Sequence, residues 1–225
     1  MGLDIIAVTD HNAAENSRAA IAAAANAGIA ALAGIEICTA EDVHLLALFD
    51  KCEQAVSVQA VLYEKLQPGV NNPDTIGMQV IADEFDEVTG MCDRLLIGSV
   101  RLSIDEAVGL VHENGGLAIA CHVDREAFGI IGQLGFIPPG LALDAVELSH
   151  RAAMEAARRI GLNASMPIIR SSDAHRPEDM GRASTVFHIE SPTIPEIRLA
   201  LRSECGRRAE AVLQPIQPIQ PVQPP

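Results

Sequence analysis

Large aromatic side chains are scarce in this sequence of 225 residues, which contains no Trp, one Tyr and five Phe. Hydrophobic residues make up 48% of the chain, enough for a core, but that core must be packed from Ala, Ile, Leu and Val. Branched aliphatic residues fill the interior of a (β/α) barrel in this way. The length fits one large domain or two small ones, and the alternation of expected strands and helices favours one.

Lysine is nearly absent, with only Lys51 and Lys65, and 16 Lys and Arg stand against 30 Asp and Glu for a formal net charge of −14. A protein that binds long nucleic acids usually carries a basic patch that neutralises phosphates, and the sequence contains none. We therefore expect no long polynucleotide partner. A small phosphorylated substrate remains compatible, because bound divalent cations can dominate the field of a site.

Paired CxxC cysteines are also missing, since the five cysteines are scattered and odd in number. This pattern is typical of reduced, mostly buried thiols in a cytoplasmic protein. Cys38 and Cys121 lie beside candidate metal ligands, and we favour the interpretation that both are small core residues. The N-terminus lacks the basic region of a signal peptide, and the weakly polar stretch 19–35 is too interrupted for a membrane span.

Apolar runs alternate with helical patterns along most of the chain. Strands are expected over residues 4–9, 30–37, 43–49, 117–121, 145–148, 167–170 and 185–189, with helices over 14–27, 53–66, 103–114, 151–160 and from 193. Segment 68–96 fits either a β-hairpin or a short helical excursion. The alternation predicts a mainly parallel sheet or barrel in one domain, residues 1–210, and the Gln-Pro-aliphatic triplets predict a disordered tail over 211–225.

Four short blocks of possible metal ligands follow expected strands. They are Thr9-Asp10-His11-Asn12, Gly34-Ile35-Glu36 with His44, Ala120-Cys121-His122, and Ser172-Asp173-Ala174-His175. Chemistry in parallel α/β proteins takes place at the strand ends, and metal-dependent ester hydrolysis needs converging imidazoles and carboxylates. Singly, His44 could be a structural histidine and Asp173 a helix N-cap. Their joint occurrence at successive strand ends favours a metal site.

In order and spacing, these blocks resemble the second to fourth motifs of the PHP-domain (polymerase and histidinol phosphatase) metallophosphoesterases, over about residues 2–203. The stretches 122–125 and 135–138 are similar to those of a stand-alone bacterial subgroup. The resemblance implies an α/β fold, a distorted (β/α)7 barrel of PHP type. It also implies up to three Mn²⁺, Zn²⁺ or Fe²⁺ ions at the C-terminal ends of the strands.

The resemblance further assigns a role to each candidate ligand. Glu36 would bridge two ions, with His44 and His122 completing one of these sites and Asp173 binding the other ion. His11 and His175 would hold a third ion, and Asp10 would orient the ligands from outside.

Two arginines lie within three residues of a candidate ligand. Arg125 and Arg176 could bind a substrate phosphate bidentately, with surface ion pairs as the alternative interpretation.

The family opens with a strand that carries a His-x-His pair and a following Asp, and this sequence starts beyond that point. We therefore expect the first βα unit, about thirty residues in size, to be missing from this chain. Either the natural protein has that strand upstream of Met1, which we favour, or the chain is truly short and metal-poor or inactive.

These features predict a cytoplasmic, metal-dependent phosphoesterase that hydrolyses a small phosphomonoester or nucleotide-like molecule with a metal-bridging hydroxide. An amidohydrolase-like C–N hydrolase on the same metal site is the alternative, as is an inactive binding module if the chain is truly short. A polymerase-associated nuclease is disfavoured by the charge of −14. The identity of the substrate, the preferred metal and the oligomeric state stay open.

Overall fold

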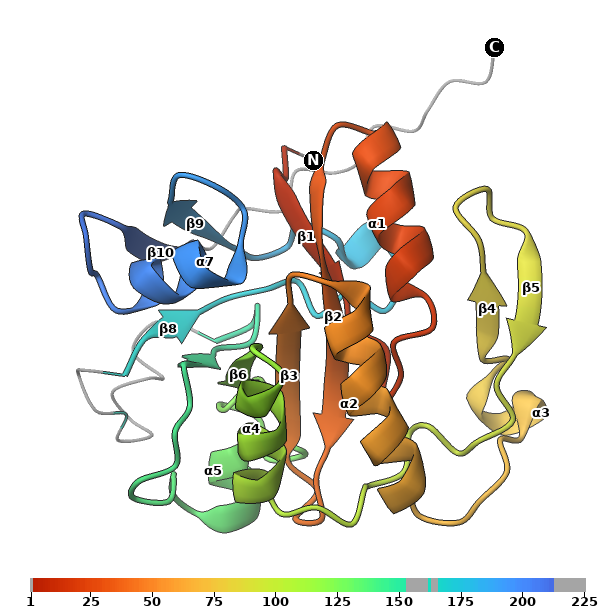
Figure 1. The fold of residues 1–225 in the computed structure, drawn as a ribbon. Coiled ribbons are helices and arrows are strands. Elements are labelled where there is room, and N and C mark those ends of the chain that lie inside the picture. Colours follow the sequence, from red (N-terminus) through yellow and green to blue (C-terminus); the bar gives the residue numbers. More distant parts are fainter. Residues whose placement is uncertain (1, 153–161, 163–165, 213–225) are drawn as a thin grey trace.

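A six-stranded sheet forms the centre of the computed structural model, which describes residues 2–152, 162 and 166–212 (Figure 1). The strands lie in the order β1-β2-β3-β6-β7-β8. Their bounds are β1 Ile5–Val8, β2 Ala30–Cys38, β3 His44–Phe49, β6 Leu117–Ala120, β7 Ala145–Glu147 and β8 Ile168–Ile169. All six coincide with strands expected from the sequence.

The sheet is mixed because β3 runs against both of its neighbours. The pairs β1–β2, β6–β7 and β7–β8 are parallel, whereas β2–β3 and β3–β6 are antiparallel. Only residues 39–43 connect β2 to β3, too few for the crossover helix that a parallel pair requires. The prediction of a mainly parallel sheet therefore has to be corrected at β3.

The sheet curls into a half-barrel (Figure 1). Among the described residues, β1 and β8 form its two edges and do not pair with each other. The (β/α)7 barrel predicted from the resemblance is thus present as an open sheet of six strands, because a closed barrel needs each strand to be paired on both sides.

Side chains alternate along the strands and separate two apolar cores. Ile35 and Ile37 pack with α2 (Cys52–Lys65) and α4 (Ile104–Glu113), while α1 (Ser17–Asn26) lies against β2 on the same side. Leu46 and Ile119 face the other side and pack with α7 (Ile194–Leu201). Because the side-chain period of a strand is two, Glu36 points away from the helical layer formed by α1, α2 and α4.

Segment 68–96, for which the sequence allowed either a β-hairpin or a short helix, contains both. The short helix α3 (Pro73–Ile76) precedes an antiparallel pair, β4 (Val80–Ala82) and β5 (Val88–Met91), which stands beside α1 in Figure 1. A further short helix, α5 (Ile130–Leu134), and a 3₁₀ turn, η1 (Pro177–Asp179), lie in later loops.

The C-terminal part of the described chain differs from the sequence interpretation in one element. Strand β9 (Ser184–His188) pairs with β10 (Arg208–Val212), which was not expected, and β10 runs past the predicted tail boundary at residue 211. Its charged residues Arg208 and Glu210 alternate with apolar ones, as on a strand with one solvated face. The expected helix over 151–160 and most of the expected tail lie outside the described residues.

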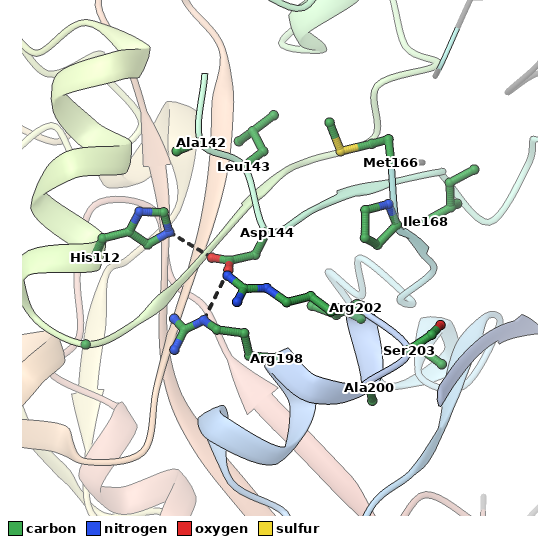
Figure 2. Close-up of a pocket in the computed structure, with 14 residues that line it drawn as sticks. His112, Ala142, Leu143, Asp144, Met166, Ile168, Arg198, Ala200, Arg202 and Ser203 are labelled. Carbon is green, nitrogen blue, oxygen red and sulfur yellow. Dashed lines mark hydrogen bonds and ion pairs between the residues drawn. The ribbon is translucent and has the colours of Figure 1, made fainter. Parts of the chain in front are cut away.

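The buried carboxylate of Asp144 lies at the N-terminal ends of β6 and β7, beside a cavity of about 1090 Å³ (Figure 2). Asp144 accepts from the backbone N–H of Ala118 at 2.9 Å, contacts His112 Nε2 at 2.8 Å and pairs with Arg198 Nε at 3.2 Å. Arg198 also donates to the carbonyl of Gly116 at 2.7 Å. These contacts join α4 and α7 to the sheet at the end opposite to the predicted ligands Glu36 and His122.

No helix in the part of the chain that the structure describes has both the length and the apolar character required to cross a membrane.

Replacement of Gly34 by Ala tests how closely β2 approaches the end of β1. A Cβ at this position would lie 2.5 Å from Thr9 Cγ2 and 3.1 Å from the carbonyl oxygen of Val8. We expect Gly34→Ala to lower the free energy of unfolding by about 1–3 kcal/mol, measured by urea denaturation.

Gly109→Ala is the matched control, because a Cβ at Gly109 meets open space within α4. It should stabilise the protein by about 0.4–1 kcal/mol. Equal effects of the two substitutions would contradict the close approach of β2 to β1.

Candidate metal centre

The backbone after β1 continues the parallel pairing with β2 and places His11 beside Glu36. The N–H of Glu36 donates to the carbonyl of Asp10 at 3.1 Å, and the N–H of Asn12 donates to the carbonyl of Glu36 at 2.9 Å. His11 and Glu36 thereby form an isolated parallel bridge. These main-chain hydrogen bonds hold the first block of predicted ligands against the second.

The Glu36 carboxylate lies at the centre of three imidazole rings. Its Oε1 is 2.7 Å from Nδ1 of His44 and 3.5 Å from Nε2 of His122, and its Oε2 is 3.9 Å from Nδ1 of His11. Ligand atoms of His11, Glu36 and His44 all lie within 4.8 Å of one another. The structure therefore brings together four of the six predicted metal ligands.

The ring nitrogens around Glu36 are suited to binding a metal ion. Nδ1 is buried in His11 and His122 and has no hydrogen-bond partner there among the described residues, whereas Nδ1 of His44 lies 2.7 Å from Oε1 of Glu36. Buried polar atoms are ordinarily paired, because an unpaired one loses its hydration without compensation. Imidazole nitrogen and carboxylate oxygen are the ligands that Zn²⁺ and Fe²⁺ use. A divalent cation near Glu36 would be ligated by one nitrogen of each ring.

The electrostatics of the cluster favour a charged carboxylate. Burial alone would raise the pKa of Glu36, but its contacts with His122 and His44 lower the pKa well below the ordinary value. Burial lowers the pKa of His11, against the opposing attraction of Glu36. A neutral His11 beside an ionised Glu36 is the protonation state in which both groups can bind a metal.

Two neighbours hold these rings in place. His44 stacks on Phe128 with ring centroids 4.4 Å apart, and the backbone N–H of His44 donates to the carbonyl of Phe128 at 2.9 Å. The buried Asn12 donates from Nδ2 to the carbonyls of Leu96 and Gly98 at 2.9 and 2.8 Å, and its Oδ1 accepts from the N–H of Cys38 at 3.1 Å. Neither Asn12 nor Phe128 was singled out as a site residue from sequence.

Asp173 and His175 lie outside the two ligand clusters of the described residues. Asp173 has a left-handed backbone, with φ of 46°, and its carboxylate accepts from Nη2 of Arg125 at 2.5 Å. His175 is exposed, with Nδ1 at 3.7 Å from the Asp173 carboxylate. Asp173 and His175 are thus neighbours of each other, but the metal-ligating role of both remains a prediction.

The remaining predicted residues fall into two kinds of environment. Asp10 accepts from Nδ2 of Asn16 at 2.9 Å, and Asn16 in turn bonds the backbone of Val80 and Ala82, so Asp10 is tied to strand β4. Arg176 is exposed at the surface. The predicted roles of Asp10 in orienting ligands and of Arg176 in binding substrate stay predictions.

Two buried groups of the site were not predicted as functional. The thiol of Cys121 lies within 4.8 Å of ligand atoms of Glu36 and His122. Glu147, at the end of β7, accepts from Ser171 Oγ at 2.6 Å, and burial raises its pKa to about 7. A signal existed for Glu147, because it is a charged residue at the C-terminal end of an apolar strand.

Comparisons with known proteins agree with this architecture. Residues 147–204 match a family model described as PHP-associated. The structure of the lesion-specific endonuclease PfuEndoQ from Pyrococcus furiosus superimposes with a TM-score of 0.69 at 17% identity, covering 92% of this chain and 50% of that one. Endonuclease Q bound to a 27-mer duplex with an abasic lesion gives 0.60 at 20% identity, covering 80% and 41%.

The structure of an amidohydrolase from Chromobacterium violaceum superimposes with a TM-score of 0.50 at 20% identity, and the alignment covers 79% of this chain and 80% of that one. No curated protein matches the sequence. The chain spans half or less of the length of the two endonuclease structures. The half-barrel is therefore similar in fold to these solved structures, and the match to the PHP-associated family model covers residues 147–204.

Asn12→Asp should destabilise the loop that holds His11. The substitution keeps the shape of the side chain but replaces a donor to two carbonyls by an oxygen, leaving both buried acceptors facing a negative charge. We expect a loss of at least about 2 kcal/mol in the free energy of unfolding, measured by urea denaturation of metal-free protein.

The control is Asn72→Asp at the exposed N-cap of α3, where Asn72 accepts from the N–H of Asp74 at 3.1 Å. Asn and Asp cap helices equally well, so this change should stay within about 0.5 kcal/mol. A similar loss at both positions would mean that Asn12 does not clamp the loop.

Proposed function

We propose that this protein is a metal-dependent phosphoesterase that hydrolyses a small phosphomonoester or nucleotide-like molecule. The observation that carries the proposal is the Glu36 carboxylate, placed within 4 Å of His11, His44 and His122, together with the buried Nδ1 atoms of His11 and His122 that have no hydrogen-bond partner in the described chain. Packing alone gives no reason to gather three imidazole rings, two of them with an unpaired buried nitrogen, around one carboxylate. Metal binding does.

Divalent cations bound here would supply an activated water and neutralise charge on the phosphoryl oxygens. The residues that would hold them are His11, Glu36, His44 and His122, with Asp173 and His175 as further candidates. Of the metals predicted, Zn²⁺ and Fe²⁺ suit the imidazole-rich set best, and Mn²⁺ suits the carboxylates.

Arg125 is the strongest candidate for binding the substrate phosphate. Its guanidinium pairs with Asp173 in the structure, 2.5 Å apart, and is about one-third exposed. If Asp173 turns to a metal ion, the guanidinium is left facing the same mouth and can bind phosphate with two parallel hydrogen bonds. Arg125 would then balance the charge of Asp173 before substrate binds and that of phosphate afterwards.

Cleavage of damaged DNA is the second candidate function. It is supported by the likeness of 92% of this chain to one half of the Pyrococcus endonuclease. The net charge of −14 argues against it, because an acidic chain repels a polyanion unless another domain supplies the binding surface. An amidohydrolase activity rests only on a fold likeness at a TM-score of 0.50. A small substrate is therefore favoured.

Glu36→Gln tests the metal centre directly. The amide keeps the volume of the side chain but removes its charge and turns an N–H₂ toward the imidazoles, so metal content after desalting should fall at least about 10-fold. Hydrolysis of p-nitrophenyl phosphate and nucleotides should fall with it, measured beside a 27-mer duplex with an abasic lesion and a cyclic amide.

The control Glu53→Gln removes an exposed carboxylate that pairs with Arg18 on the surface, and it should change neither metal content nor rate. Wild-type protein without bound metal after loading would overturn the proposal. Cleavage of the lesion duplex alone, or of the cyclic amide alone, would replace phosphomonoester hydrolysis by one of the alternatives.

Arg125→Gln tests phosphate binding. Loss of a charge-assisted hydrogen bond of about 1.5–3 kcal/mol should lower kcat/KM roughly 10- to 100-fold, largely through KM, with metal content unchanged. Arg18→Gln, on the exposed face of α1, is the matched control. An unchanged KM for Arg125→Gln would exclude Arg125 from phosphate binding.

A further inference from the structure

We propose that the Cys121 thiolate is an additional ligand of the metal ion held by Glu36 and His122. This inference rests on the proposed metal centre and adds to it a soft donor that was interpreted from sequence as a core residue. Ligand atoms of Glu36, Cys121 and His122 all lie within 4.8 Å of one another.

The side of the sheet on which Cys121 lies follows from strand alternation. Leu117, Ile119 and Cys121 belong to the core cluster on the face away from α2 and α4, and Ala118 and Ala120 belong to the other. The register continues across β3, where the N–H of Cys121 donates to the carbonyl of His44 at 3.0 Å. Glu36 and Cys121 therefore share one face because of the backbone, and not because of a chance rotamer.

Convergence of two adjacent residues requires a break in that alternation. Neighbouring side chains on a regular strand point to opposite faces. His122 has φ of 29°, in the left-handed region that non-glycine residues seldom adopt, and this turn brings its ring to the same carboxylate as Cys121. Strained backbone of this kind is typical of functional sites.

The burial of Cys121 and His122 is consistent with a role in binding a metal ion. His122 and Cys121 are each 3% exposed, and Nδ1 of His122 has no hydrogen-bond partner among the described residues. On metal binding, the S–H bond of Cys121 would break, a sulfur–metal bond would form, and the proton would pass to solvent.

A thiolate changes which metals the site prefers. Sulfur is a soft donor that favours Zn²⁺, Co²⁺ and Fe²⁺, whereas Mn²⁺ and Mg²⁺ prefer oxygen. With Cys121 as ligand, the ion at Glu36 and His122 should be zinc or iron, not manganese. This narrows the predicted set of Mn²⁺, Zn²⁺ or Fe²⁺ for this position of the centre.

Cobalt spectroscopy on the full chain tests the inference without any substrate. Metal-free, reduced protein is titrated with Co²⁺, and the wild type should develop both visible d–d bands and a near-ultraviolet sulfur-to-cobalt charge-transfer band. Cys121→Ser should lose the charge-transfer band and keep the d–d bands. Cys38→Ser, at an equally buried cysteine whose sulfur joins neither ligand cluster, should keep both.

Metal affinities provide the second readout. In chelator competition, Cys121→Ser should weaken Zn²⁺ binding at least about 10-fold and leave Mn²⁺ binding within about 3-fold. If Cys121→Ser does not fold, X-ray absorption of the zinc-loaded wild type decides the question, because a sulfur ligand lies at about 2.3 Å from zinc.

The outcomes separate the two proposals. Bound Co²⁺ without a charge-transfer band, a band that survives in Cys121→Ser, equal weakening for Zn²⁺ and Mn²⁺, or zinc without sulfur would each overturn the role of Cys121 while the metal centre stands. Failure of the wild type to bind any of these ions would overturn the proposed function together with it.

Discussion

Because the Glu36 carboxylate lies mostly out of water, the groups around it must provide the stabilisation that solvent would otherwise give. Three imidazole rings do so in part, at distances of 2.7 to 3.9 Å, and keep the carboxylate charged. The buried Nδ1 atoms of His11 and His122 have no hydrogen-bond partner in the described chain. Such an arrangement suits a cation-binding site better than a hydrophobic core. Much of the surrounding structure keeps these rings in position.

The antiparallel strand β3 is the part of the fold that makes this convergence possible. A short connection returns the chain directly beside β2, so His44 begins its strand opposite Cys38 and next to Glu36. The pairing of β3 with β6 then delivers Cys121 and His122 to the same end. A long crossover between β2 and β3 would have placed His44 at the opposite end of the sheet, since parallel strands begin together. The pairing register of β2, β3 and β6 thus places the candidate ligands at the same end of the half-barrel.

Charge explains how an acidic chain can act on a phosphorylated molecule. The formal charge of −14 repels anions at long range, but under the proposed function a bound cation and Arg125 would reverse the sign of the field at the mouth of the half-barrel. The ion pair between Arg125 and Asp173 keeps both groups satisfied near this mouth. The similarity to the endonuclease structures concerns the fold. Which substrate is cleaved depends instead on the individual side chains that the fold positions.

The sequence alone determined the six strands of the central sheet and the residues at their ends, because apolar runs followed by His, Asp or Glu are local signals. It identified His11, Glu36, His44 and His122, which the structure assembles. Tertiary structure decided the antiparallel direction of β3, the pairing of β9 with β10, and the proximity of Cys121 and Glu147 to the site. Strand direction and side-chain convergence depend on which strands become neighbours. That choice is made by long-range packing, and no local pattern in the chain records it.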